Sequence, residues 1–532
     1  MNGFPIISIL TFLPLFGAIA IIGLNAEQKK LARWLALGFS ILALALTVFM
    51  WARFNPASGD LQFVETYHWI PSLAAQYHVG VDGLGLLMVL LTAIIVPMAM
   101  LASWNIEERV PIHFALMLFL QAGLFGTFTA LNFFHWFLFW ELSLIPAFFL
   151  IKLWGGPNRS AAATQFFVYT MVGSIAMLLA FLALYLTTIY APGADLTKIS
   201  ENPSRMFDFT MLAERGREGT LASDFAVKLG WYSLSVRHLA LIIFAGAFLG
   251  FAVKVPLVPF HTWLPNAYAE APTGTTMLLT GVMSKMGVYG FIRILLPIFG
   301  EQMRWILTPL LWLTVITIVY SAGAAFAQKD LKRVLAYSSI NHLGFCLLGV
   351  FAVARFGDNE AALASEKTAA LNGVFLQMFN HGLTAATLFW FVGFLEQRGS
   401  RSINDFGGLR KVAPIFCGLM GIALFSSLGL PGLNGFIGEF LIFKGTFSLT
   451  TWATSLSVIG LLITAIFILT ILQRVFNGPL NEKWARLPDL TLTERVVVLP
   501  SIALMFLLGI YPQLVLGVIN STAVQMVSRL HL

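Results

Sequence analysis

Long apolar stretches, separated by short polar connections, run along the whole chain. A membrane-spanning helix needs about 20 consecutive, mostly apolar residues. By that length the pattern predicts fourteen spans, and so an all-α polytopic membrane protein. The expected limits are 3–24, 31–51, 81–103, 111–130, 131–152, 164–189, 238–264, 272–298, 303–326, 331–352, 367–395, 412–445, 454–476 and 493–518. The first stretch has no basic region or small-residue cleavage site, which favours a span over a cleaved signal.

Two of the predicted spans are interrupted by helix breakers. The seventh reads FAVKVPLVPFHTWLP and contains Pro256 and Pro259, and the twelfth reads SSLGLPGLNGFIGEF and contains Pro431 and Gly432. Within lipid, unpaired backbone groups are tolerated only inside protein or along a wet cavity. Breaks at corresponding positions of two halves indicate two inverted five-helix repeats, with the working site at the breaks.

This symmetry predicts four parts along the chain. The parts are 1–110 with helices 1–3, 111–300 with the first repeat of helices 4–8, 301–480 with the second repeat of helices 9–13, and 481–532 with helix 14. The first repeat includes a long loop, 190–237, expected outside the cell. Lysines and arginines gather in the odd-numbered connections, which the positive-inside rule places in the cytoplasm with both termini on the periplasmic side.

Composition supports the membrane class and excludes others. The chain is 58% hydrophobic and only 11% charged, whereas soluble domains carry roughly 25% charged residues. The net charge of +7 lies mostly between spans, which indicates membrane orientation and not nucleic-acid binding. Cys346 and Cys417 form no ligand cluster, and the chain has no Walker A, His-Glu-x-x-His or dinucleotide motif. We therefore expect no metal and no redox chemistry in this chain.

Four ionisable residues stand inside predicted spans: Glu141, Lys254, Lys285 and Glu439. A charge at the bilayer centre costs roughly 2.5–3.5 kcal/mol on insertion scales, so such residues usually face the bundle interior with a partner. Glu141 lies about 15 Å from either end of its span. Lys254 precedes the first break and Glu439 follows the second, where helix dipoles favour their charges.

Two histidines in spans, His342 and His381, could pass protons between these charges because imidazole titrates near neutrality. Small polar residues could orient waters beside them, namely Ser143, Thr170, Ser174, Ser338, Asn341 and Thr384. His135 and His261 are more simply explained as packing or span-end residues. Pro146, one turn beyond Glu141, is expected to loosen the helix and free a carbonyl near Ser143.

A structural explanation competes with the functional one. A single buried Glu–Lys pair could simply clamp two helices, although such pairs often add no net stability. Four charges and two histidines, spread over six spans of which two are broken, favour a proton pathway over a structural network.

The quoted stretches together resemble the antiporter-like membrane subunits of respiratory complex I. The resemblance covers essentially the whole chain and rests on HWFLFWELSLIPAFFLI, FAVKVPLVPFHTWLPNAYAEAPTGTTMLLTGVMSKMGVYG, LKRVLAYSSINHLGF, FNHGLTAATLF and LPGLNGFIGEF. It implies that Glu141, Lys254, Lys285, His342, His381 and Glu439 are the family's proton-relay residues. A glutamate at 439 and a chain that stops after helix 14 favour the M-type branch (the mitochondrial ND4 counterpart) over the L-type and N-type branches.

The resemblance also implies the setting. Quinone reduction in partner subunits would shift a Glu141–Lys254 pair, and a proton would pass through Lys285 and the histidines towards Glu439. FMN, iron–sulfur clusters and quinone are expected in partner subunits, with L-type and N-type chains beside this one in a bacterial cytoplasmic membrane. One departure is the stretch ARFGDNEAALASEKTAA between the two histidines, which is longer than the family pattern.

Two other functions remain open. A multi-subunit Na⁺/H⁺ antiporter or a membrane-bound hydrogenase would use the same fold. A passive scaffold that links pumping neighbours would keep the helices and do without the relay. Replacing Glu141 separates the scaffold from a pump.

Overall fold

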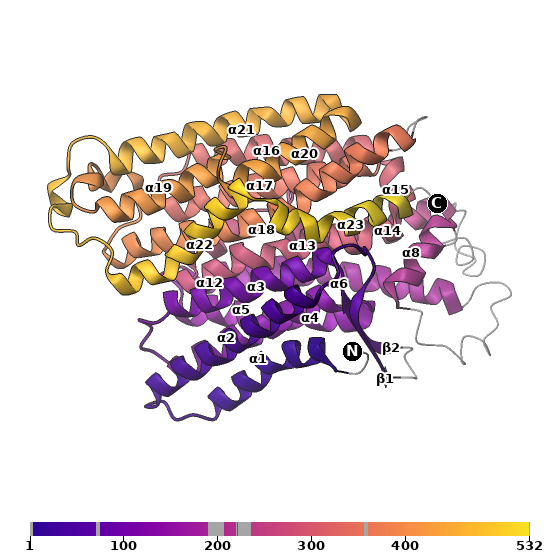
Figure 1. Cartoon of the computed structure of the whole chain (residues 1–532), viewed down its shortest axis with the longest axis horizontal. Helices are drawn as coiled ribbons and strands as arrows, with labels where there is room; N and C mark the ends of the chain where they lie inside the picture. The colour runs from indigo at the N-terminus through magenta and orange to yellow at the C-terminus, as the bar shows by residue number, and fades with distance from the viewer. Residues whose placement is uncertain are drawn as a thin grey trace.

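The computed structural model describes residues 4–70, 75–189, 207–219, 221, 236–355 and 360–530. Its long helices lie side by side, nearly parallel to the long axis of the molecule (Figure 1). The first group of helices is α1 (Ile6–Ile22), α2 (Lys29–Arg53), α3 (Gly83–Ala102), α4 (Val110–Thr129), α5 (Phe133–Trp154), α6 (Arg159–Ile189), α8 (Phe209–Arg217), α10 (Val236–Lys254), α11 (Trp263–Glu270), α12 (Thr273–Leu278), α13 (Ser284–Gly290) and α14 (Leu296–Ile298).

The second group completes the bundle. It comprises α15 (Gly300–Trp305), α16 (Leu307–Phe326), α17 (Leu331–Val353), α18 (Glu360–Gln397), α19 (Pro414–Leu428), α20 (Asn434–Leu449), α21 (Thr451–Ile471), α22 (Leu492–Ile510) and α23 (Gln513–Arg529). In the described part of the chain, twelve helical stretches are long and apolar enough to cross a membrane, and α1 and α19 are shorter apolar helices. The predicted limits of α2, α3, α4 and α5 are correct to about two residues.

The last predicted span differs from the structure at its end. We expected one helix over 493–518, but α22 ends at Ile510 and α23 starts at Gln513. Pro512 disfavours a helical conformation at Tyr511, where the backbone has φ −128° and ψ 65°. The chain then continues in much the same direction, so that both labelled termini lie towards the same end of the bundle (Figure 1).

A short hairpin adds strand structure that the all-α prediction did not include. Strands β1 (Gln62–Ile70) and β2 (Ala75–Val81) pair antiparallel, with Tyr67 opposite Tyr77. The carboxylate of Glu65 in β1 accepts a 2.7 Å hydrogen bond from the backbone N–H of Ile7. The hairpin therefore caps the start of α1, where helical N–H groups lack partners.

The hairpin is also tied to α8. His78 Nδ1 of β2 lies 2.9 Å from Asp208 Oδ2, and Asp208 caps α8 by accepting from the N–H of Thr210 at 2.9 Å. Burial raises the pKa of Asp208, but its hydrogen bonds to His78 and the backbone outweigh burial and leave this pKa below its ordinary value. This end of the bundle is thus held by polar contacts.

Burial divides the helices into central and peripheral ones. We compare the share of buried residues in the most apolar 18-residue stretch of each span. This share is 100% in α18 and 94% in α17 and in Thr273–Ile298, but only 33% in α2, in α22 and in the span that contains α21. Helices that bury every face in a membrane bundle are shielded from lipid. The central helices are therefore the ones that can carry polar groups at low cost.

Helix α6 lies against α10 along the two glycines of the GxxxG pattern. A Cβ added at Gly250 would lie 3.0 Å from the carbonyl oxygen of Gly173, and one at Gly246 would lie 2.9 Å from that of Ala176. Two glycines four residues apart thus let the backbones of the two helices approach closely. It holds the end of α10, and with it the first break, against α6.

Candidate functional site

The first helix break follows Lys254, the last residue of α10, and lasts until α11 begins at Trp263. The indole N–H of Trp263 donates to the carbonyl of Val253 at 3.0 Å, and the N–H of Val258 donates to Thr317 Oγ1 at 3.1 Å. Side chains thus satisfy backbone groups that the break leaves unpaired. As predicted, Lys254 stands at the C-terminus of a half-helix.

Lys254 lies over an aromatic ring. Its side chain is buried, with 2% exposure, and its Nζ lies 5.0 Å from the centre of the Trp140 ring. The indole of Trp140 donates a 3.0 Å hydrogen bond to Ser174 Oγ, which fixes the ring. A desolvated ammonium over indole gains about 2 kcal/mol. The sequence analysis did not single out Trp140, because a tryptophan in an apolar span looks like an ordinary packing residue.

Glu141 points elsewhere. It lies on the face of α5 that also exposes Leu138, Ile145 and Phe149, and it forms no ion pair with Lys254 within 4.0 Å in the described part of the chain. Its Oε1 is buried without a hydrogen-bond partner. The expected direct pair is absent because neighbouring helical residues point about 100° apart, so that Trp140 and not Glu141 faces Lys254.

The structure shows no interruption of the helix at Pro146, and the freed carbonyl near Ser143 stays a prediction. Helix α5 continues from Phe133 to Trp154 with Pro146 inside it. The hydroxyl of Ser143 donates to the carbonyl of Trp140 at 2.7 Å and lies 3.7 Å from the sulfur of Met286. Ser143 is therefore engaged with its own helix and with the Lys285 helix.

The second break lies between α19 and α20. Gly429 and Gly432 have φ values of +79° and +94°, a region that glycine enters at little cost. Polar side chains hold the break: Asn380 of α18 donates to the carbonyl of Asn434 at 2.6 Å, and Ser426 donates to Asn434 Oδ1 at 2.5 Å. The fully buried α18 thus fixes the start of α20.

Four of the six predicted relay residues come together near this second break. Lys285 Nζ lies 2.8 Å from His381 Nδ1. The rings of His381 and His342 have their centres 5.1 Å apart, and His342 Nδ1 lies 2.9 Å from Glu439 Oε1. These residues come from α13, α18, α17 and α20, four separate helices. The structure therefore places a continuous polar series inside the most buried part of the bundle.

Small polar groups complete both ends of this series. Lys285 Nζ also donates to the carbonyl of Thr280 at 2.5 Å and lies 3.4 Å from Ser284 Oγ. Thr280 lies in the π-helical segment Leu279–Met283, a geometry that is rare and frequent at functional sites. At the other end, Gln377 Nε2 donates to Glu439 Oε1 at 3.1 Å, and Ser427 Oγ lies 3.2 Å from His342 Nε2.

These partners were missed in the sequence because single serines, threonines and glutamines carry no spacing signal. A small cavity lies beside them, lined by residues that include His342, His381, Asn380, Thr384 and Glu439. It has room for about one water molecule, and its polar lining offers the partners that a buried water needs.

The predicted supporting residues serve different places. Thr384 lies 3.1 Å from Ser426 beside the cavity. Asn341 donates to the carbonyl of Ile318 at 2.8 Å, and Thr170 donates to that of Phe166 at 2.8 Å. Ser338 is buried at 4% exposure. Of this set, Thr384 lies at the relay, Ser174 and Ser143 lie around Trp140, and Asn341 and Thr170 bond away from both.

The described residues hold no group of three or more histidine, cysteine, aspartate or glutamate side chains suited to a metal ion. Three other histidines are buried among the described residues, and each lies beside aromatic rings. His135 stacks on Tyr77 at 4.7 Å between ring centres, His261 lies 5.2 Å from the ring of Tyr320, and His113 lies 4.8 Å from that of Trp154. They take no part in the series of contacts around His342.

Two broken helices, together with a buried Lys–His–His–Glu series at the second break, are typical of an ion-translocating membrane bundle. Residues 130–464 match the family described as NADH:quinone oxidoreductase/Mrp antiporter, TM. The chain belongs to this family.

Individual comparisons agree with this assignment. The chain is 35% identical over 552 residues to NADH-quinone oxidoreductase subunit M of Mycobacterium tuberculosis, covering 98% of this chain and 93% of the relative. It superposes on a chain of respiratory complex I from Thermus thermophilus with bound NADH at a TM-score of 0.80 and 28% identity, covering 98% and 99% of the two chains. A chain of the Mrp complex from Dietzia sp. shares the fold, with a TM-score of 0.79, 18% identity, and coverage of 98% and 100%.

Proposed function

We propose that this chain is the M-type, proton-translocating membrane subunit of an NADH:quinone oxidoreductase. The observation that carries the proposal is the series from Lys285 through His381 and His342 to Glu439, which has hydrogen-bond distances at both ends and a contact between the two rings at its centre. Each neighbour pair joins a group that can release a proton to one that can accept it. The chain itself performs no redox step. Its role in the translocase is to move protons while partner subunits reduce quinone.

The contacts suggest the order of transfer. The Lys285 ammonium donates to Nδ1 of a neutral His381, and transfer along this bond leaves a neutral amine and an imidazolium. An imidazole can take up a proton at one ring nitrogen and release one at the other. A water in the small cavity would bridge the two rings, and Nδ1 of His342 would deliver the proton to the carboxylate of Glu439.

Glu141 and Lys254 form the input side of this proposal. Lys254 is buried over Trp140, and Glu141 is the partly exposed carboxylate of the adjoining residue. A change of charge at Glu141 would act on Lys254 through a low-dielectric interior, where Coulomb interactions are strong even without direct contact. In this arrangement Glu141 influences Lys254 through its electric field and without an ion pair.

We further propose that the chain crosses the membrane fourteen times. Helices α10–α11 would form the broken seventh crossing, α19–α20 the broken twelfth, and α22 with α23 the last. The repeats would span 111–300 and 301–480, flanked by 1–110 and 481–532. The loop at 190–237 lies mostly outside the described residues. The expected setting is a bacterial cytoplasmic membrane with both termini periplasmic, beside L-type and N-type chains, with FMN, iron–sulfur clusters and quinone in other subunits.

The test uses the assembled complex in proteoliposomes. Glu141→Gln should lower both proton pumping and NADH-driven quinone reduction at least about tenfold while assembly stays normal, since it removes a titrating group from the relay. Leu138→Gln, which places the same amide on the same exposed face of α5, is the matched control and should keep activity. Wild-type pumping in Glu141→Gln would instead support the scaffold.

The antiporter alternative is supported by the shared fold alone. It predicts that proton movement needs sodium and persists without quinone reduction. Genes for quinone-site and flavin subunits beside this one favour the proposed function. Neighbours that encode only small antiporter subunits would overturn it.

A further inference from the structure

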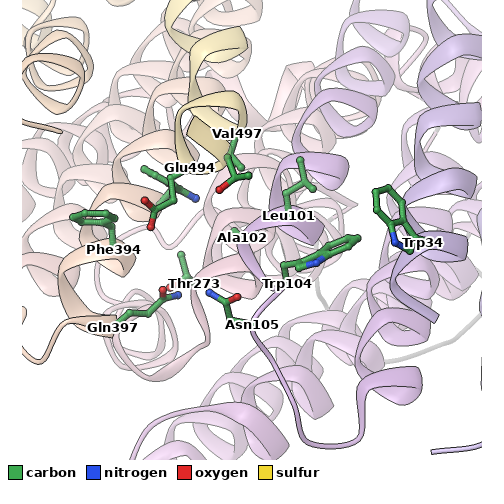
Figure 2. Close-up of a pocket in the computed structure, with 12 residues that line it drawn as sticks. Trp34, Leu101, Ala102, Trp104, Asn105, Thr273, Phe394, Gln397, Glu494 and Val497 are labelled. Atoms are coloured by element: carbon green, nitrogen blue, oxygen red, sulfur yellow. The ribbon is translucent and has the colours of Figure 1, made fainter. Parts of the chain in front are cut away.

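A crevice opens between peripheral and central helices at the end of the bundle where α2 begins and α3 ends. It encloses about 400 Å³ and is lined by Trp34 of α2, Leu101 of α3, Thr273 of α12, Phe394 of α18 and Val497 of α22, among others. Figure 2 shows side chains from all these helices converging on one space. The crevice has no part in the relay described above.

Its walls differ in their exposure to lipid. Helices α2 and α22 are among the least buried spans, at 33% each, whereas α18 and the Thr273–Ile298 stretch behind them are almost fully buried. A space between two peripheral helices that ends on central ones opens sideways, towards the bilayer. Lipids can enter from that side.

The lining is divided into an apolar and a polar part. The rings of Trp34 and Trp104 pack edge to face, with 5.2 Å between their centres, and Trp34 is 63% exposed. In Figure 2 the polar ends of Asn105 and Gln397 lie away from these two rings, on the side of Thr273. Tryptophan favours the level of the lipid headgroups. The crevice thus offers apolar surface for an acyl chain beside amides for a headgroup.

One carboxylate, Glu494, stands at the polar side of the crevice. Its Oε2 accepts from the N–H of Thr491 at 2.8 Å, and its Oε1 accepts a 3.0 Å hydrogen bond from Nη2 of Arg398, which lies behind the lining. The Arg398 guanidinium lies 3.3 Å from the centre of the Phe394 ring, which is also part of the lining. A carboxylate beside amide donors complements a headgroup in which an ammonium follows a phosphate.

We propose that this crevice binds a phospholipid with an ethanolamine headgroup. The phosphate oxygens would accept from the amides of Asn105 and Gln397, and the primary ammonium would donate to Glu494. A quaternary ammonium has no N–H group and cannot make that bond. One acyl chain would lie inside the crevice, along Leu101, Ala102 and Val497.

The experiment uses the assembled complex in phosphatidylcholine liposomes. Trace phosphatidylethanolamine or phosphatidylglycerol carries the same photoreactive acyl chain, and labelled peptides around 101–105 and 492–497 are quantified by mass spectrometry. A charge-assisted hydrogen bond should give the ethanolamine probe about a tenfold preference. Ala102→Phe should remove the labelling by filling the crevice, whereas Val496→Phe, on the exposed face of α22, should keep it.

Glu494→Gln tests the headgroup separately, because it preserves the size of the side chain and should leave equal labelling by both probes. Three results would overturn the proposal: equal labelling by both probes in the wild-type complex, labelling that survives Ala102→Phe, or no labelling by any lipid because another subunit fills the crevice.

Discussion

Lys285 and His381 lie 2.8 Å apart, Nζ to Nδ1, although 96 residues separate them in the chain. At that distance two positive charges repel strongly in a buried site, so that the pair carries one proton between them at low cost. The pair is therefore a site where a proton has two alternative positions. His342 and Glu439 extend the pair on the His381 side only, so that the series has a direction, from Lys285 to Glu439.

Replacing His381 should interrupt the relay. His381→Gln keeps a polar side chain but removes the imidazole, which can take up a proton at one nitrogen and release one at the other. General acid–base groups contribute at least about a hundredfold in rate. We expect pumping and coupled quinone reduction to fall at least tenfold in proteoliposomes that contain a fully assembled complex. His113→Gln is the control, because His113 is buried on α4 beside the Trp154 ring and away from the relay. Equal activity in both variants would contradict the relay.

Two substitutions of Lys254 should differ. Lys254→Arg keeps a cation over Trp140 but cannot readily give up a proton, whereas Lys254→Ala removes the charge as well. Both variants should pump less than the wild type, and the alanine variant less than the arginine variant. Proton uptake after a pulse of NADH measures the difference. Near-wild-type pumping in both would remove Lys254 from the pathway.

Trp140 should matter through Lys254. Trp140→Leu loses the ring under the ammonium and the donor to Ser174, a change of about 2 kcal/mol. Pumping should fall by roughly tenfold to thirtyfold, and Trp140→Phe should recover part of it because a ring remains. If Trp140 only packs α5 against α10, both variants will instead lower assembly and leave the turnover of assembled complex unchanged.

Alanine substitutions at two glycines of the second break distinguish the effect of backbone strain from that of displacing Glu439. Gly429 and Gly432 both have positive φ, so that alanine costs about 1 kcal/mol at either position. A Cβ at Gly429 would lie 2.9 Å from Glu439 Oε2, whereas one at Gly432 meets no atom within 4 Å. Gly429→Ala should therefore reduce pumping several-fold more than Gly432→Ala, at similar levels of assembly. The reverse order would show that Glu439 tolerates displacement.

The sequence allows the helices to be predicted better than their contacts. Apolar length locates α2 to α5 closely, and the breakers locate both interruptions, because these signals are local. The pairing of Lys285 with His381 depends on how α13 and α18 pack, which no local pattern records. The same holds for the expected Glu141–Lys254 pair: Lys254 lies over the Trp140 ring, because side-chain direction on α5, and not span membership, decides contact.

The β1–β2 hairpin and Pro512 show the other limit. The strands of the hairpin have nine and seven residues, too few for a clear periodic pattern, and Pro512 interrupts what the sequence presents as one apolar stretch. Glu65 within β1 looks like a surface charge in the sequence, yet it is buried and caps α1.

His342 is the central residue of α17, and Lys285 lies near the middle of the Thr273–Ile298 stretch. The relay thus connects positions at similar depth. Charge that moves at constant depth does no work against the membrane potential, which amounts to about 2.3 kcal/mol per charge per 100 mV for a full crossing. The energy delivered by quinone reduction must therefore be used where protons enter and leave this level, and the series of histidines sets only which entry is connected to which exit.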